Sequence, residues 1–297
     1  MRIAEIIQKY CFKLLHENFL NQKFFLKAEI LNLSANTSAP GITSSKISNK
    51  NVTVSLTSYG KRLEEVYLTI ESIMQGFLKP NRIVLWLQED LQGRTLPRTL
   101  VNQMSRGLEI RYTTDIKSYK KLIPAIKVFP EDIIITIDDD VMYNYDFLDR
   151  FIRAYNDNPK YIYAGRVRKI QLDKKGTPKS YRKWPSLKNG APVSKLNMGI
   201  GVGGILYPPH CLDERVFDEE TFMDVCPHAD DIWFWAMAKL GGYDVAKVMT
   251  KDEDGFDFLE NQSVQDVALM NTNLSSICEN DSQFNSVIKK IGIKMND

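Results

Sequence analysis

The chain has 297 residues, enough for one large domain or two modest ones with a buried core. Its formal net charge of +2 is nearly neutral and gives no general affinity for polyanions, so we do not expect nucleic acid as a partner. The four cysteines are widely spaced, which favours reduced thiols in a cytoplasmic protein over a zinc site or a disulfide framework. We expect neither a signal peptide nor a transmembrane helix, because no long apolar run or small-residue cleavage site begins the chain.

The first segment has the periodicity of an amphipathic helix. Apolar residues recur at helical spacing from Arg2 to about Leu20, and Phe24 to Leu26 indicate a second helix. A helix packed on the main domain is the simpler interpretation, and a helix on a membrane surface or a partner is the alternative. From Asn32 to Asn51 the composition shifts to Ser, Thr, Asn, Pro and Gly, which predicts a linker. We therefore expect a helical segment and linker over residues 1–48 and a second domain over 49–297.

Strands and helices are expected to alternate after this linker. Short β-favouring runs predict the strands, and apolar residues at helical spacing predict the helices. The expected strands are residues 51–59, 82–88, 108–112, 133–137 and 161–167, and the expected helices begin near residue 61, 97, 118 and 147. This alternation predicts right-handed βαβ units, hence an α/β fold with a Rossmann-type, mostly parallel sheet flanked by helices.

An isoleucine-rich strand runs directly into three carboxylates. Residues 133–137 are too short a run for a typical helix and predict a buried central strand, which Asp138, Asp139 and Asp140 follow. Ligands of open α/β sheets bind beyond the carboxyl ends of the strands. Three acids repel one another unless a cation lies among them, and oxygen ligands suit Mg²⁺ or Mn²⁺. The position predicts a divalent-metal site, with a solvated acidic turn as the alternative.

The glycines between Gly199 and Gly204 match the GxGxxG pattern of dinucleotide-binding proteins, but their context does not. That pattern requires a helix opening on the glycines, whereas a β-like run and two prolines follow here. We therefore expect no nicotinamide or flavin. The glycines either let the backbone approach a ligand closely or form a bend.

A second acidic pair, Asp230 and Asp231, opens a largely apolar helix. One aspartate is explained as an N-cap, and the other remains as a carboxylate on a rigid helix, which suits a general base. Capping alone is the alternative.

Residues 166–196 are rich in Lys, Arg, Tyr and Trp. A solvated basic loop is one interpretation. The other is a flap on the side of the site where an acceptor substrate would bind. There an aromatic face such as that of Trp184 suits sugar rings, and the basic groups suit a lipid diphosphate.

These segments together resemble a GT-A-type nucleotide-sugar glycosyltransferase of the bacterial surface-polysaccharide kind, similar to family 2. The resemblance rests on the strand Val52 to Tyr59, the strand and acids Ile133 to Asp140, the stretch Gly201 to Pro209, and Ala229-Asp230-Asp231. It spans roughly residues 50 to 250, and it implies a GT-A-like domain with a DxD motif.

The resemblance also implies roles for individual residues. Asp138 and Asp140 match the two acids of DxD, one contacting ribose or metal and the other coordinating Mn²⁺ or Mg²⁺ at the diphosphate. Asp231 matches the general base of inverting members, with Asp230 as the second candidate. The residues implied at the nucleotide are Thr57, Ser58, Tyr59, Arg62, Lys121, Asp138, Gly203 and Gly204, and those implied at the metal are Asp138, Asp139 and Asp140.

The implied reaction moves a sugar from a nucleotide-diphosphate donor, preferably a UDP-sugar, to a hydroxyl of a glycan or lipid-linked acceptor. It would invert the anomeric centre and serve surface-polysaccharide biosynthesis in the cytoplasm, with peripheral contact at the inner face of the membrane left open. Two other classes remain as alternatives. One is another metal-dependent nucleotide-sugar enzyme, a nucleotidyltransferase or hydrolase, and the other is a non-catalytic carbohydrate-binding module.

Overall fold

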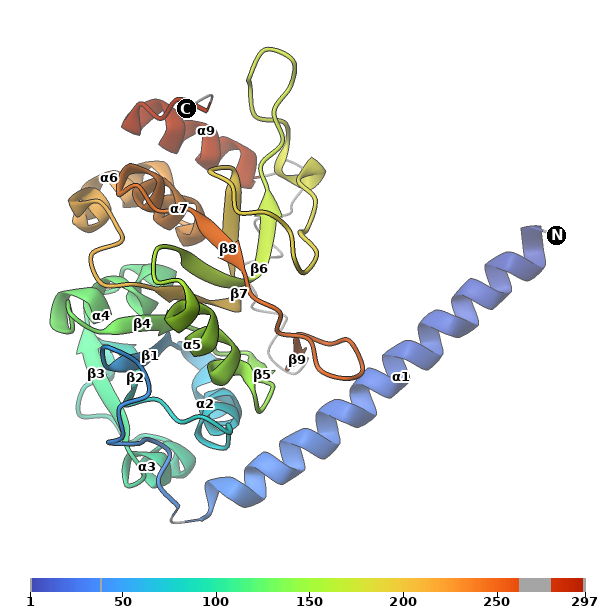
Figure 1. Cartoon of the computed structure of the whole chain (residues 1–297). Coiled ribbons are helices and arrows are strands. Elements are labelled where there is room, and N and C mark those ends of the chain that lie inside the picture. Colours follow the sequence, from blue (N-terminus) through green and yellow to red (C-terminus); the bar gives the residue numbers. More distant parts are fainter. Residues whose placement is uncertain (1, 38, 262–278, 296–297) are drawn as a thin grey trace.

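A seven-stranded sheet forms the centre of the molecule, with the strand order β3-β2-β1-β4-β7-β6-β8 (Figure 1). The computed structural model describes residues 2–37, 39–261 and 279–295. Four strand pairs are parallel, and only β7 runs antiparallel to its neighbours β4 and β6. The strands are β1 Val52–Thr57, β2 Arg82–Gln88, β3 Leu108–Thr113, β4 Ile133–Thr136, β6 Ile162–Lys169, β7 Asn197–Tyr207 and β8 Val245–Lys247. The expected α/β fold with a mostly parallel sheet is confirmed.

Helices cover both faces of this sheet, because alternate strand residues feed two separate cores. Val84 and Trp86 on β2 face one core, whereas Ile83 and Leu85 face the other, as the two-residue period of a strand requires. The helices are α2 Val66–Met74, α3 Arg98–Met104, α4 Ile123–Val128, α5 Phe147–Asp157, α6 Glu219–Val225, α7 Asp230–Leu240 and α9 Glu279–Ile291. Apolar residues of α2 and α5 fill one core, and those of α4, α7 and α9 fill the other.

Short elements complete the edge of the sheet where the strands β1, β2 and β4 end. A second, two-stranded sheet pairs β5 (Val141–Tyr143) with β9 (Phe258–Glu260). The 3₁₀ turns are η1 Gly60–Glu64, η2 Glu89–Leu91, η3 Lys117–Lys121, η4 Tyr181–Lys183 and η5 Glu214–Phe217. Two of these turns, η1 and η3, replace the helix starts that the sequence predicts near residues 61 and 118.

The N-terminal segment is one helix, α1 (Arg2–Ala35), and not two. No glycine or proline interrupts these residues, so nothing ends the helix near Leu20 or at the predicted start of the linker, Asn32. Its C-terminal half packs on the domain, where Leu31 is fully buried against Leu68, Met142 and Leu259. The interpretation of a helix packed on the main domain is therefore confirmed for this half.

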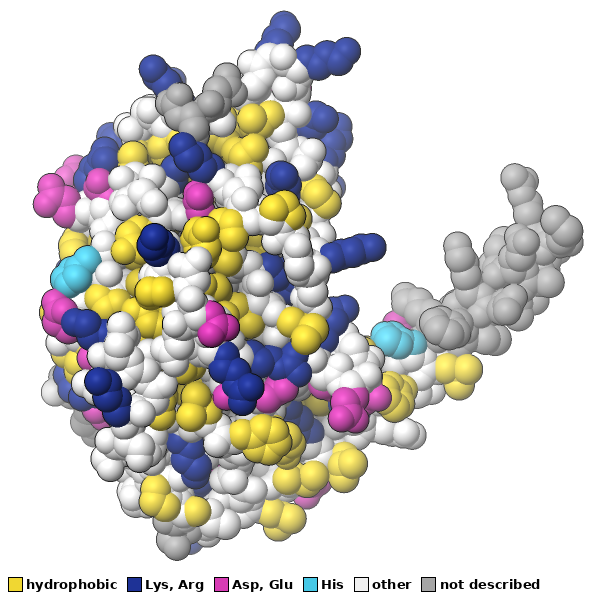
Figure 2. Space-filling view, in the orientation of Figure 1, with side chains coloured by type: hydrophobic (Ala, Val, Ile, Leu, Met, Phe, Trp, Pro, Cys, Tyr) yellow, Lys and Arg dark blue, Asp and Glu magenta, His cyan; other side chains and the backbone are white. Residues whose placement is uncertain are grey.

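The outer side of α1 carries apolar side chains that are open to solvent. Leu15, Leu26 and Leu33 are each about two-thirds exposed, and Figure 2 shows yellow side chains along the described part of this helix. Within the described residues, no helix combines the length and the apolar character that crossing a membrane requires.

The segment that the sequence predicts as a linker is irregular but lies on the domain. The Gly41 amide donates to the carbonyl of Arg106, and the Thr43 amide donates to the carbonyl of Pro80. A side chain at Gly41 would collide with Met74. Farther along the chain, Cys211 and Cys226 are buried free thiols, as expected, while Cys278 lies outside the described residues.

A buried ion pair joins α2 to the turn after α3, and its loss tests this packing. Arg106 donates two hydrogen bonds to Glu71, at 2.8 and 2.9 Å, and both side chains are at most 1% exposed. Arg106→Ala would leave the Glu71 carboxylate buried without its cationic partner, with only the Gln75 and Gln103 amides donating to it among the described residues. We therefore expect the free energy of unfolding to fall by about 3–5 kcal/mol in urea titration. Arg94→Ala, which breaks an exposed pair with Asp90, should change it by less than about 1 kcal/mol. Equal losses in the two variants would contradict this account.

Candidate functional site

A cavity of about 1250 Å³ opens at the carboxyl edge of the sheet and collects most of the predicted site residues. The loop after β1 contributes Thr57, Tyr59 and Arg62, and the loop after β4 contributes the three consecutive aspartates. Turn η3 and the start of α7 complete its floor. Parallel strands end at the same edge, which is why segments far apart in the sequence meet there.

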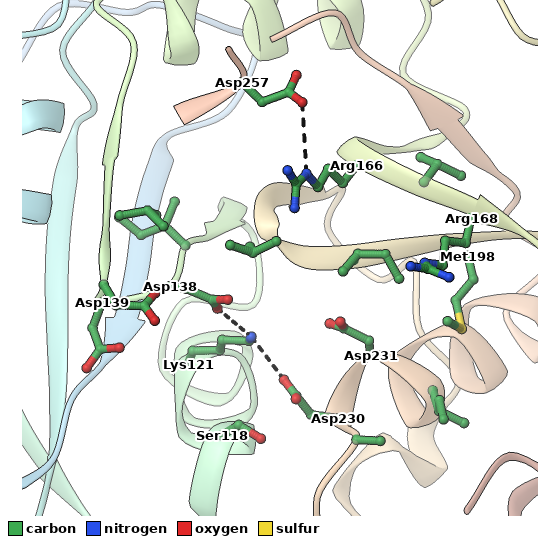
Figure 3. Close-up of a pocket in the computed structure, with 18 of the residues that line it drawn as sticks. Ser118, Lys121, Asp138, Asp139, Arg166, Arg168, Met198, Asp230, Asp231 and Asp257 are labelled. Carbon is green, nitrogen blue, oxygen red and sulfur yellow. Dashed lines mark hydrogen bonds and ion pairs between the residues drawn. The ribbon is translucent and has the colours of Figure 1, made fainter. Parts of the chain in front are cut away.

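Lys121 lies at the centre of this floor. Its Nζ is 2.9 Å from Oδ1 of Asp138 and 3.2 Å from Oδ2 of Asp230 (Figure 3). Ser55 on β1 donates a hydrogen bond to the Lys121 carbonyl and so fixes the turn that carries it. Burial alone would lower the pKa of Lys121, but the surrounding carboxylates outweigh burial and raise this pKa well above its ordinary value. Lys121 is therefore a fixed positive charge in the floor of the cavity.

The three consecutive aspartates do not point to one place. Asp138 faces the cavity, and its side chain is 29% exposed. Asp139 turns away from it (Figure 3), accepting from Ser58 Oγ at 2.6 Å and from Arg62 Nη1 at 2.7 Å. Asp140 lies 3.0 Å from the other terminal nitrogen of Arg62. Burial raises the pKa of Asp139, although Arg62 and the Ser58 hydroxyl act against that rise.

This divergence bears on the predicted metal site. Among the residues that the structure describes, no three His, Cys, Asp or Glu side chains converge on a point where a metal ion could bind. The geometry therefore does not bring all three aspartates to one metal ion. Asp138 and Asp140 nevertheless line the same cavity, and Mg²⁺ is commonly held by one or two carboxylates together with substrate phosphates. These two residues fit a metal bound jointly with a nucleotide.

Helix α7 begins at Asp230, but neither acid caps it. The N-cap is Ala229 and makes no side-chain hydrogen bond, so the predicted capping role of Asp230 or Asp231 is wrong. Both carboxylates instead turn into the cavity, where Asp230 pairs with Lys121. This arrangement is possible because the first backbone amides of a helix need no side chain of its own first turn.

Asp231 has one carboxylate oxygen that accepts no hydrogen bond from the described residues. Its Oδ2 accepts from the Gly201 amide at 2.9 Å, while its Oδ1 is buried without a hydrogen-bond donor among the described residues. Burial and the neighbouring charge of Asp230 raise the pKa of Asp231 to about 7, against the opposing effects of Lys121 and the Gly201 amide. A carboxylate with this pKa can accept a proton near neutral pH.

The glycine-rich strand β7 does not bring the predicted glycines, Gly203 and Gly204, into the cavity. A side chain at Gly203 would meet the Arg166 amide at 2.4 Å, and one at Gly204 (φ +76°) would meet the Phe147 ring at 2.5 Å. Both glycines therefore serve packing within and beneath the sheet, and a contact of these two residues with a nucleotide stays a prediction that the cavity lining does not support. The stretch lies inside strand β7, as its β-like context predicts.

Gly201 is the glycine that touches the site. A Cβ there would lie 2.7 Å from Lys121 Nζ and 3.1 Å from Asp231 Oδ1. The sequence predicts close approach for this run of glycines but does not single out Gly201, because only the pairing of β7 brings α7 and η3 against it.

The basic segment over residues 166–196 also departs from the prediction that Trp184 faces a sugar. Trp184 is 2% exposed and packs on Tyr181 and Phe284, so it offers no free face to a sugar ring. Arg166 and Arg168 line the cavity instead. Lys247, some eighty residues later, joins them through the pairing of β8 with β6.

Comparisons with known proteins identify no family. No family model matches the sequence, and no curated protein matches it. Three solved structures share 12% identity with the chain. The first, a CMP-2-keto-3-deoxy-manno-octonic acid synthetase complexed with CTP, covers 75% of this chain and 99% of its own, with a TM-score of 0.39.

The other two structures are similarly distant. A cytidylyltransferase from Leptospira borgpetersenii serovar Hardjo-bovis covers 83% of this chain and 97% of its own, with a TM-score of 0.42. A glucosyl-3-phosphoglycerate synthase from Mycobacterium tuberculosis, in complex with Mn²⁺, UDP and phosphoglyceric acid, covers 42% and 47%, with a TM-score of 0.27. These likenesses concern the course of the chain alone.

The raised pKa of Asp231 predicts a pH-dependent change in stability. The folded state keeps a proton on Asp231 up to about pH 7, whereas the unfolded chain releases this proton near the ordinary pKa of 3.8. The free energy of unfolding should therefore fall as the pH rises from about 4 to about 7, because ionisation of Asp231 then favours the unfolded state. Asp231→Asn cannot ionise, and at about pH 8 we expect it to be more stable than the parent by on the order of 2–4 kcal/mol. At about pH 4 the two proteins should differ little.

Urea titration at both pH values measures this difference. Asp149→Asn, which removes an exposed ion pair with Arg153, is the matched control and should show no such pH dependence. Parallel stability curves for the parent and Asp231→Asn would mean that Asp231 ionises normally.

Proposed function

We propose that this cavity is the active site of a metal-dependent glycosyltransferase. It would move a sugar from a nucleotide-diphosphate donor, preferably a UDP-sugar, to a hydroxyl of a glycan or lipid-linked acceptor. The observation that carries the proposal is the position of Asp231, a carboxylate with an unpartnered oxygen and a pKa near neutrality, in the cavity that Asp138 and Asp140 also line.

The charge balance of the donor side supports a bound cation. Arg62 pairs with Asp139 and Asp140, and Lys121 pairs with Asp138 and Asp230. Together with Asp231, five carboxylates therefore surround these two cations in the cavity. A divalent ion held by Asp138 and Asp140 would restore the balance and neutralise the charge that develops on a departing nucleoside diphosphate.

The loop after β1 is suited to the nucleoside. Tyr59 is 45% exposed at the cavity wall, and the Arg62 guanidinium lies 5.7 Å from its ring centroid. Ser58 is buried and holds Asp139, so its role is to position that acid and not to touch the base. Thr57 lines the cavity, and its hydroxyl donates to the Trp86 carbonyl.

Asp231 would take the proton from the acceptor hydroxyl as that oxygen attacks the anomeric carbon. Oδ2 of Asp230 likewise lacks a hydrogen bond among the described residues, but it lies 3.2 Å from the Lys121 ammonium, whereas Oδ1 of Asp231 has no such ion pair there. Asp231 is therefore the better base. One displacement with a base on the side opposite the leaving group inverts the anomeric centre. The same residues thus support an inverting reaction.

A nucleotidyltransferase is the rival reading of the same cavity. There the nucleophile that attacks the α-phosphorus of a nucleoside triphosphate is either a sugar phosphate, which is already ionised, or a sugar hydroxyl, which needs a proton acceptor. The spare oxygen of Asp231 therefore favours attack by a hydroxyl. The rival predicts release of pyrophosphate, whereas the proposed reaction releases a nucleoside diphosphate.

Calorimetric titration tests the donor site. UDP and GDP are titrated into the protein with and without Mn²⁺, and we expect one of them to bind in a metal-dependent manner. Asp138→Asn should weaken that binding at least about tenfold, because it removes a charge from the metal site. Asp149→Asn, far from the cavity wall, should leave it unchanged. Failure of every nucleotide to bind in the presence of metal would remove the proposed function.

Product analysis on Asp231→Asn tests the base. We expect the transfer rate to fall by about 10²–10⁴-fold while the affinity for the nucleoside diphosphate stays nearly the same, because the base acts only on the acceptor. In the parent, the rate should rise with pH through about 7 as the carboxylate ionises. Pyrophosphate as the product, whatever the rate of the variant, would establish the nucleotidyltransferase instead.

A further inference from the structure

One wall of the cavity is basic and is not used by the donor site. Arg166 and Arg168 on β6 and Lys247 on β8 line it, and we call these three residues the basic cluster. Figure 3 shows Asp231 with Lys121 on one side and the two arginines on the other. The cluster therefore lies across the general base from the donor carboxylates.

The positive charge of Arg166 is only weakly compensated. Its guanidinium lies over the Phe258 ring at 4.5 Å, and the nearest carboxylate oxygen among the described residues, Oδ2 of Asp257, is 3.9 Å from Nε. The other oxygen of Asp257 accepts from the Thr250 hydroxyl at 2.7 Å. The Arg166 side chain is 46% exposed, so a ligand can reach it.

The other two cations are held by neutral groups. Arg168 lies over the Tyr181 ring at 4.8 Å and donates to backbone carbonyls of Tyr181 and Trp184. Lys247 donates to the carbonyls of Gly165 and Val248. In the described part of the chain, neither has a carboxylate within ion-pairing distance. The carbonyls orient these side chains without cancelling their charge.

The positive charges also crowd one another. Burial lowers the pKa of Lys247, and although Asp257 opposes this, Lys251 and Arg166 lower it further. Lys251 and Lys188 line the same cavity. Like charges held this close are costly unless an anion lies among them.

The sheet sets the distance from this cluster to the base. Arg166 pairs with Ile200 across β6 and β7, and the next residue, Gly201, donates its amide to Asp231. Paired and consecutive Cα atoms are roughly 5 and 4 Å apart, so the Arg166 backbone lies within about 10 Å of the Gly201 amide. An acceptor of one or two sugar rings can reach both groups.

We propose that the basic cluster binds a phosphate group on the acceptor, so that the substrate is a phosphorylated saccharide. The role as acceptor site rests on the proposed function. Three cations beside one carboxylate match a divalent phosphate better than a singly charged carboxylate, and the planar arginine forks suit phosphate oxygens. The phosphate would hold the acceptor hydroxyl at Asp231.

Binding of inorganic phosphate tests the cluster directly. The protein is saturated with UDP and Mn²⁺ to fill the donor site, and phosphate is then titrated calorimetrically. We expect phosphate to bind, and Arg166→Gln to weaken that binding about tenfold by removing charge-assisted hydrogen bonds. Lys247→Gln should act in the same direction. Lys175→Gln, an exposed lysine of the same β6–β7 connection, is the matched control and should have no effect.

Vesicles distinguish a lipid-linked phosphate from a soluble one. Phosphatidylcholine vesicles are compared with and without polyprenyl diphosphate, and binding that requires the diphosphate and is lost in Arg166→Gln would assign a lipid-linked acceptor. Binding of phosphate without a response to these vesicles would assign a soluble acceptor. Absence of phosphate binding, or binding that Arg166→Gln leaves unchanged, would overturn the proposal.

The same measurements separate this proposal from the donor site. If UDP fails to bind but Arg166→Gln abolishes phosphate binding, the glycosyltransferase assignment falls and the phosphate site stands. If UDP binds and phosphate does not, the phosphate site falls and the proposed function stands.

Discussion

The buried ammonium group of Lys121 is the contact on which the arrangement of the site depends. It lies between Asp138, at the end of β4, and Asp230, at the start of α7. Without a cation there, carboxylates from two distant segments would repel one another in a partly buried space. Breaking such a network by removing one partner typically costs about 3–5 kcal/mol, so the cavity and the local fold share one electrostatic requirement.

This requirement also divides the cavity into two halves. The donor half is acidic, and Arg62 and Lys121 pair with four of its carboxylates. The opposite wall carries Arg166, Arg168 and Lys247, which are held mainly by rings and carbonyls. Asp231 lies where the halves meet, and its pKa is raised because burial and Asp230 together outweigh the pull of Lys121. A proton acceptor at that boundary can serve a reaction between two different substrates.

Much of the fold could be predicted because its signals are local. Strand β2 has the bounds that its β-branched and aromatic run predicts, and the acids after β4 follow from a strand and its loop alone. Other features depend on contacts between distant segments, which no local pattern encodes. Trp184 is buried because Phe284 of α9 packs on it, and Lys247 reaches the cavity because β8 pairs with β6. The separate roles of Gly201, Gly203 and Gly204 likewise follow from what each meets in space.

Strand β7 contacts both the general base Asp231 and the basic wall of the cavity. Its Gly201 amide holds Asp231, and a side chain at that position would collide with Lys121, so the strand can approach the network only because the residue is glycine. The residue before it, Ile200, pairs with Arg166 of the basic wall. Strand β7 also pairs with β4, whose end carries the donor carboxylates, so one strand places the general base relative to both halves. The separation between the base and the basic wall is thus fixed by the pairing of β7 with β6. The separation between the base and the donor site is fixed by the pairing of β7 with β4 and by Lys121, which links Asp138 to Asp230 beside the base.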